Sequence, residues 1–326
     1  MDCLNKNEYI LLIISLIPVF DFFLALTGIY IHPLVYLANH HYVLYKMLSV
    51  VFLIILYKWV NCAIINNYDL DNHSKVTMII LVIISLCIFL IPIVHAWNVI
   101  LITICNNKPI YIEKDEYFPG HVKLETNFII IRDSILSIVS KGEMQCMDKV
   151  LPTTTYLSDH KEDKCWKFIF LKNRGEFENI MIEYPQLSEL LSDPLIENAA
   201  ISMLEPNVSI PEHKGYFKGY LRYHLCIETS DNNPDKPYII VDNEKYTWKT
   251  GESIMFDDMY NHKVVNNSNY RRIVLFLDIK RQHLLFPFNI INEIICKLID
   301  INPLYKMFNA KQHETEDLKI ISTETF

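Results

Sequence analysis

Apolar residues dominate the first third of the chain, whereas apolar and polar residues alternate in much of the last third. Three long apolar runs cover residues 9–31, 42–65 and 76–105. A helix that crosses a bilayer needs about 20 largely apolar residues, so each run predicts a membrane span. We expect residues 1–105 to form a transmembrane region of about three helices. The first run lacks a short apolar core followed by a small-residue cleavage site, so we expect it to remain uncleaved.

The pattern changes after the third run. Residues 106–125 are polar and contain proline, which favours a linker. Residues 127–141 place isoleucines on one face at helical spacing, and a short helix is expected over 186–191. Between these helices, 142–164 has the composition of a loop and 166–170 is typical of a strand.

From residue 199 onward the hydrophobic period is two, which places alternate side chains on opposite faces of a strand. Turns separate six short stretches of this kind, at 199–204, 220–228, 237–241, 253–256, 262–266 and 271–279. Short strands without intervening helices favour a sandwich or jelly roll. The predicted fold is an N-terminal α-helical transmembrane region and a C-terminal all-β double-stranded β-helix, or jelly roll, with flanking helices. We assign residues 126–281 to the jelly roll and 282–326 to an amphipathic segment with a polar tail.

The net charge and the cysteine pattern restrict the classes of partner and the cellular compartment that we expect. The net charge is -8, without a basic stripe of interleaved aromatic residues, so no nucleic-acid partner is expected. Eight cysteines include no Cys-x-x-Cys pair, which argues against a zinc ribbon or disulfide scaffold and favours a reducing compartment. Lysines near the apolar runs are balanced between the two sides, so the positive-inside rule selects neither orientation. We expect an integral membrane protein with its C-terminal half on the membrane surface, the cytoplasmic side being weakly favoured.

Histidines and one arginine in the period-two region form a candidate site. Arg222 and His224 are two residues apart on an expected strand, so both point to one face. His213 stands just before Gly215 in a turn, and His262 stands at a strand start. Imidazoles at the strand ends of a barrel rim suit Fe(II), which accepts nitrogen ligands and leaves positions open for substrate and oxygen.

A second arginine extends this site. Arg272 begins another expected strand, and its neighbour Arg271 must point to the opposite face, so only one of them can enter a pocket. An arginine without an obvious carboxylate partner in the sequence suits a carboxylate ligand held by two hydrogen bonds. Taken singly, a histidine in a β-protein is usually structural and an arginine is usually solvated or ion-paired. The joint spacing is what points to a site.

That spacing resembles the aspartyl/asparaginyl β-hydroxylase family of Fe(II)/2-oxoglutarate dioxygenases. In the family, a histidine is followed nine residues later by an arginine and two further on by a second histidine. Another histidine is followed ten residues later by an arginine, and a serine precedes the first histidine by eleven residues. The matching residues are Ser202, His213, Arg222, His224, His262 and Arg272. The resemblance is specific over 199–280 and thinner from Tyr117 onward.

The resemblance implies an iron centre held by His213 and His262. Most enzymes of this chemistry add a carboxylate to the two histidines, but the residue two positions after His213 is Gly215. The family typically has glycine there, which implies that water completes the shell of the metal. Asp258 would hold that water.

The resemblance also implies a place for the co-substrates 2-oxoglutarate and oxygen. Arg222 and His224 would orient the end of 2-oxoglutarate that chelates the metal, whereas Arg272 and Ser202 would bind its C5 carboxylate. The implied reaction hydroxylates a C–H bond while 2-oxoglutarate loses carbon dioxide to give succinate. The alternative is a non-catalytic, membrane-anchored protein that keeps the barrel as a 2-oxoglutarate- or metal-binding scaffold. Retention of every ligand position argues against this alternative.

The substrate is a lipid or a protein. The family includes hydroxylases of Asp and Asn side chains and membrane-bound bacterial enzymes that hydroxylate the acyl chains of lipid A. The local sequences around Arg222, Trp248 and Arg272 resemble the second branch more than the first. Residues 284–308 form either an amphipathic segment lying on the membrane, which would suit a lipid substrate, or a helix packed on the barrel.

Overall fold

The structure is a computed structural model that describes residues 93–105 except 95, 107–150 except 112, 164–301 except 233, and a few isolated positions before residue 60. The membrane spans expected over 1–105 lie mostly outside the described residues. In the part of the chain that the structure describes, no helix is long and apolar enough to cross a membrane. The chain divides into two compact units, one of Met1–Ile100 with Lys297–Ala310 and the other of Leu101–Cys296 with Lys311–Phe326. The site lies in the second unit.

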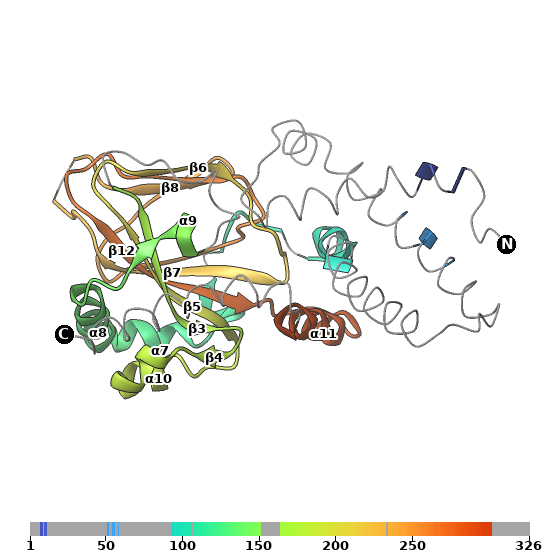
Figure 1. The fold of residues 1–326 in the computed structure, drawn as a ribbon, viewed down its shortest axis with the longest axis horizontal. Helices are drawn as coiled ribbons and strands as arrows, with labels where there is room; N and C mark the ends of the chain where they lie inside the picture. Colours follow the sequence, from blue (N-terminus) through green and yellow to red (C-terminus); the bar gives the residue numbers. More distant parts are fainter. Residues whose placement is uncertain are drawn as a thin grey trace, which may run out of the picture. The chain divides into compact units, whose positions relative to one another are not determined.

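Two antiparallel sheets form the second unit (Figure 1). The large sheet has the order β1-β10-β7-β12-β5-β3-β2, with β4 paired to β3, and the small sheet has the order β6-β11-β8-β9. The strands are β1 (Ile110–Tyr111), β2 (Gln145–Cys146), β3 (Trp166–Asn173), β4 (Glu176–Phe177), β5 (Ile196–Leu204), β6 (Ser209–His213), β7 (Tyr220–Glu228), β8 (Tyr238–Val241), β9 (Glu244–Thr247), β10 (Ser253–Phe256), β11 (His262–Val265) and β12 (Arg272–Lys280). The arrangement is the jelly roll that the period-two pattern predicts.

Helices pack on the outer face of the large sheet: α6 (Lys114–Tyr117), α7 (His121–Thr126), α8 (Phe128–Ser140), the 3₁₀ helix η2 (Asn179–Glu183) and α10 (Pro185–Leu190). Helix α9 (Met147–Val150) packs instead in the inner core, and α11 (Phe288–Ile301) follows β12. Isoleucines of α8 and leucines of α10 pack with outward-facing residues of β5, β7 and β12 in one core cluster. The inward-facing residues of the same strands pack with the small sheet in a second cluster. The large sheet is therefore buried on both faces, which explains why its strands are almost continuously apolar.

Several segments differ from the pattern-based expectation. Residues 106–125, expected as a linker, carry β1, α6 and most of α7. They are ordered because Tyr111, Phe118 and Leu124 are buried in the outer core. The loop expected over 142–164 contains β2 and α9. The strands β6 and β9 were not among the six expected, since each is short and only weakly alternating.

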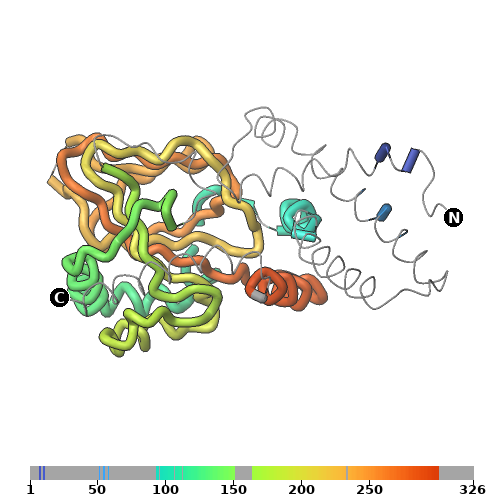
Figure 2. The backbone as a smooth tube through the Cα atoms, viewed as in Figure 1, coloured from blue at the N-terminus to red at the C-terminus, as the bar shows by residue number. Residues whose placement is uncertain are grey.

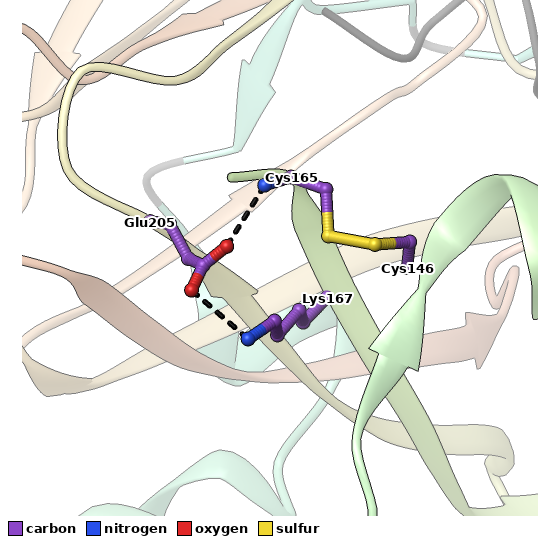
Figure 3. The surroundings of a disulfide bond; sticks show 4 residues. All are labelled: Cys146, Cys165, Lys167 and Glu205. Atoms are coloured by element: carbon purple, nitrogen blue, oxygen red, sulfur yellow. Dashed lines mark hydrogen bonds and ion pairs between the residues drawn. A yellow bond between two sulfur atoms is a disulfide. The ribbon is translucent and has the colours of Figure 1, made fainter. Parts of the chain in front are cut away.

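A disulfide joins Cys146, at the end of β2, to Cys165, just before β3 (Figure 3). The two cysteines are 19 residues apart, but the antiparallel pairing of β2 with β3 brings their Cα atoms to 5.7 Å. Glu205 fastens the same corner, because it accepts a hydrogen bond from the Cys165 N–H at 2.8 Å and pairs with Lys167 at 2.9 Å (Figure 3). This bond departs from the expectation of reduced cysteines. Disulfides persist mainly in oxidising compartments. No local sequence motif predicts this disulfide, because the register of two strands brings its cysteines together.

Candidate active site

The two histidines expected to bind metal lie side by side on adjacent strands of the small sheet. His213 ends β6 and His262 begins β11, and the two residues are direct partners in the antiparallel register. Their ring centroids are 4.1 Å apart. The strand pairing thus brings together side chains that are 49 positions apart in the sequence.

The surroundings of each ring select one nitrogen. His213 Nδ1 lies 2.8 Å from the carbonyl oxygen of Pro211, and His262 Nδ1 lies 2.9 Å from that of Tyr260. A carbonyl only accepts, so both Nδ1 atoms carry the proton and Nε2 of each ring is left as a metal ligand. Burial lowers the pKa of His213 to about 3, with His262 as a second cause. Burial likewise lowers the pKa of His262 to about 4, so both rings are neutral, as metal ligation requires.

A carboxylate from another loop occupies the space above Gly215. A Cβ atom at position 215 would lie 2.2 Å from Oδ2 of Asp258. The Gly215 N–H also donates to the carbonyl oxygen of Asp258 at 2.7 Å. The glycine is therefore required for space, and its backbone is not in the left-handed region. The structure places a carboxylate beside the position where a facial triad would have one, but it comes from a different segment.

Asp258 is held by Arg222. Arg222 Nη2 donates to Asp258 Oδ2 at 2.6 Å, and Arg222 Nε lies 3.1 Å from Oδ1 of Asp278. The guanidinium also stacks on Phe276, at 3.8 Å from the ring centroid. Burial raises the pKa of Asp258, and the charge of Arg222 opposes this shift. Arg222 is thus occupied by two carboxylates, and its expected role in orienting a co-substrate remains a prediction.

Arg272 is buried without a counter-ion. Its side chain is in a residue that is 1% exposed, and no carboxylate pairs with it among the described residues. Nη1 reaches only the carbonyl oxygen of Ser202, at the long distance of 3.5 Å, and Nε has no partner in the described region. Its guanidinium carbon lies 4.5 Å from the centroid of the Trp248 ring. Burial lowers the pKa of Arg272 to about 10, so it stays charged near neutral pH.

His224 and Ser202 complete the surroundings of Arg272. Neither ring nitrogen of His224 has a hydrogen-bond partner among the described residues. The ring lies between Trp248, Phe256 and Phe276 at centroid distances of 6.2, 5.1 and 5.4 Å. Burial holds the pKa of His224 well below its ordinary value. The Ser202 hydroxyl accepts a hydrogen bond from Trp166 Nε1 at 2.9 Å.

These residues fit a divalent metal and a dicarboxylate. Two neutral imidazoles present Nε2 side by side, whereas the described segments contain no group of three or more His, Cys, Asp or Glu side chains that could hold a metal ion. A buried arginine that has no carboxylate partner among the described residues is costly unless an anion accompanies it, and buried donors are normally hydrogen-bonded. A small carboxylate on Arg272 satisfies both requirements.

Two residues of the site were assigned no role from the sequence alone. Asp278 pairs with Arg222, and Trp248 stacks on Arg272. Both lie far from their partners in the sequence. Asp278 belongs to an alternating strand, so its inward direction was readable from its even spacing to Arg272 and Val274. Its partner depended on the pairing of β12 with β7.

Comparison with known proteins relates the jelly-roll domain to a family of hydroxylases. Residues 125–282 match the family of aspartyl/asparaginyl beta-hydroxylases, and the jelly-roll domain belongs to that family. The chain is similar to an ornithine lipid ester-linked acyl 2-hydroxylase of Rhizobium tropici, with 29% identity over 214 residues, covering 64% of this chain and 74% of that protein.

Two further similarities are more limited. The human aspartate beta-hydroxylase domain-containing protein 2 is 28% identical over 96 residues, which cover 28% of this chain and 25% of that protein. A solved Pseudomonas putida prolyl-4-hydroxylase is similar at a TM-score of 0.32 and 11% identity, over 48% of this chain and 88% of that chain.

Proposed function

We propose that this chain is a membrane-tethered, Fe(II)- and 2-oxoglutarate-dependent hydroxylase that acts on an acyl chain of a lipid. One observation carries the proposal. Two facing imidazoles with their Nε2 atoms left for a metal stand in the same jelly-roll interior as Arg272, a buried arginine that pairs with no carboxylate among the described residues. A metal and a dicarboxylate co-substrate account for both features.

His213 and His262 would hold the metal through Nε2, while the carbonyl groups of Pro211 and Tyr260 fix the tautomer and the ring orientation. When bound, Fe(II) and 2-oxoglutarate supply the oxygen activation that inserts one oxygen atom into a C–H bond. Asp258, held by Arg222, presents a hydrogen-bond acceptor beside the metal position. Gly215 leaves the room that this carboxylate needs.

Arg272 would bind the distal carboxylate of 2-oxoglutarate, with the Ser202 hydroxyl beside it. The anion would neutralise the charge of the buried guanidinium and accept charge-assisted hydrogen bonds from it. His224, neutral because of burial, would offer one donor and one acceptor to the other end of the ligand. The aromatic rings around His224 exclude water from this part of the site.

The lipid substrate is proposed from the similarity to the acyl 2-hydroxylase, which spans most of both chains. The full chain in phosphatidylcholine vesicles, supplied with Fe(II), oxygen, 2-oxoglutarate and a membrane lipid extract, tests it. We expect succinate formation together with lipids that have gained one oxygen atom, detected by mass spectrometry. Oxygen gained on Asp or Asn of added proteins, and on no lipid, would transfer the substrate to the protein class.

A matched pair of variants tests the metal ligands. His213→Ala should abolish succinate formation, whereas His283→Asn should retain it, because His283 is exposed and contacts the carbonyl oxygen of Glu116 and the ring of Tyr117, away from the proposed metal ligands. Asparagine tolerates the positive φ of 61° at that position. Full activity of His213→Ala would overturn the ligand assignment, and an inactive wild type would support the scaffold alternative.

A further inference from the structure

An exposed apolar stripe lies where the chain leaves the jelly roll. It consists of Leu285, Phe286, Ile290 and Ile294, which are 80%, 79%, 47% and 51% exposed. Figure 2 traces the chain from β12 through this segment into α11. Ile290 and Ile294 have the i, i+4 spacing of one face of α11, and Leu285 and Phe286 lie just before that helix. We name these four residues the apolar stripe.

The exposed half of α11 is itself divided. Asn289 and Glu293 are exposed beside the apolar stripe, and they form a polar line along the same helix. Asn292, Ile295 and Cys296 are buried on the opposite face. A helix that presents an aliphatic line next to a polar line on its free side is typical of segments that lie in a membrane surface.

The place where the chain enters the domain is also apolar and lies at the same edge. Arg281, just after β12, donates from Nη1 to the Tyr111 hydroxyl of β1 at 3.0 Å. Shortly before β1, Ile102 and Ile104 are 44% and 42% exposed. They end the apolar run over 76–105, which has the length of a bilayer span. Exposed aliphatic residues at both the entry and the exit favour a lipid occupant.

The buried face of α11 contacts the loop that starts at a proposed metal ligand. Residues 214–219 follow His213, and Asn292 Nδ2 donates to the carbonyl oxygen of Gly219 at 3.4 Å. A Cβ atom at Gly219 would lie 2.6 Å from Asn292 Oδ1, so the helix packs closely on this loop. The same loop exposes the aromatic ring of Tyr216, which is 52% exposed. Tyrosine is enriched where protein meets the headgroup region of a bilayer.

Two ion pairs tie this loop to the domain edge. Lys218 pairs with Asp257 at 2.6 Å, and Arg281 pairs with the same carboxylate oxygen at 2.6 Å. Arg281 Nε also donates to the carbonyl oxygen of Lys218 at 2.7 Å. Asp257 directly precedes Asp258 of the site. The segment that carries the apolar stripe is therefore joined by buried contacts to both loops of the proposed iron centre.

We propose that the apolar stripe lies in the surface of a phospholipid bilayer and holds the loop 214–219, with the adjoining metal site, against the acyl chains of that bilayer. This inference rests on the proposed function for its substrate, but the contact itself is independent of catalysis. The stripe acts as the surface by which the enzyme meets a substrate that does not leave the membrane.

A photoreactive benzophenone amino acid tests the contact directly. It replaces Ile290 or Ile294 in the full chain, which is placed in phosphatidylcholine vesicles and irradiated. We expect covalent lipid adducts from both positions, and several-fold fewer from the matched controls at Asn289 and Glu293. Adducts with peptides of the chain itself, adducts with a second copy, equal yields from the two lines, or no adduct would each overturn the proposal.

Activity then separates the surface from the chemistry. The double variant Ile290→Glu/Ile294→Glu should lower lipid hydroxylation by about tenfold or more, because it removes the apolar side chains that would be buried at the boundary between headgroups and acyl chains. Its lipid-independent formation of succinate should stay at the wild-type rate, which also shows that the domain folds. The control Asn289→Glu adds a carboxylate on the polar line and should keep hydroxylation. An unchanged rate in the double variant overturns the surface, whereas a wild type that forms no succinate overturns only the proposed function.

Discussion

The replacement Gly215→Ala probes the carboxylate of Asp258, which lies beside the proposed metal position. The added Cβ atom would lie 2.2, 2.3 and 2.5 Å from Oδ2, Cγ and Oδ1 of Asp258. Ordinary contact needs about 3.5 Å between such atoms, so the carboxylate must retreat by about 1 Å. The 2.6 Å hydrogen bond from Arg222 to Asp258 would then exceed the range of a hydrogen bond.

The magnitude follows from the burial of this pair. Breaking a buried ion pair costs about 3–5 kcal/mol in general, but Asp278 remains beside Arg222, so we expect the low end, about 3 kcal/mol. For a domain of this size that lowers the Tm by about 6–12 °C. Succinate formation should also fall strongly, because Asp258 leaves its place beside the proposed metal.

Thermal unfolding and succinate formation measure these effects, and two controls isolate the cause. Gly142→Ala has nothing within 4 Å and a φ of +77°, so it carries only the backbone penalty of about 1 kcal/mol. In an Asp258→Ala background the clashing atoms are gone, and Gly215→Ala should then cost almost nothing further. An equal cost of Gly215→Ala in both backgrounds would refute the steric reasoning.

Three more perturbations follow from the structure. Arg272→Met should raise the KM for 2-oxoglutarate by about 100-fold, since removing one partner of a buried charge pair costs about 2–5 kcal/mol; Arg271→Met should not, because Arg271 pairs with a surface glutamate, and equal KM values for the two variants would contradict the assignment. His224 has a folded-state pKa far below its unfolded value, so the apo domain should lose stability as the pH falls below about 6.5, by about 1.4 kcal/mol per pH unit from this group. Urea unfolding at pH 7 and pH 5 measures how the free energy of unfolding depends on pH. His224→Phe should reduce this dependence, and an equal dependence in the variant would show that another group causes it. The double variant Cys146→Ser/Cys165→Ser should lower the free energy of unfolding by about 3 kcal/mol, as expected for opening a loop of this length. Reductant should lower the Tm of the wild type to that of the variant, and a wild-type Tm unaffected by reductant would show that the bond does not form.

Alternation along the strands predicted the jelly roll, and it predicted which of the site's strand residues share a face. Arg271 and Arg272 illustrate its reach and its limit. The period of two requires that they point to opposite faces, but it does not say which face is the interior. The register of β12 between β5 and β7 decides this, and it buries Arg272 while Arg271 pairs with Glu228 outside.

Segments without strong periodicity were harder to predict. The stretch before residue 126 has a polar composition, yet its few aromatic residues are buried against the large sheet. Burial of this kind depends on a surface built by distant strands, so it leaves no local pattern. The same reason hides the disulfide, whose cysteines meet only because β2 pairs with β3.

The sequence by itself determined the apolar runs, the alternation of the strands and the spacing of the histidines, arginines and serine, because each is a property of neighbours along the chain. Only the tertiary structure decided that His213 faces His262, that the carboxylate of Asp258 fills the space over Gly215, and that Arg272 is buried with no carboxylate partner in the part of the chain that is described. Each of these depends on the register between strands and on the exclusion of water from a shared interior. Such pairings join residues tens of positions apart, and no local pattern encodes them.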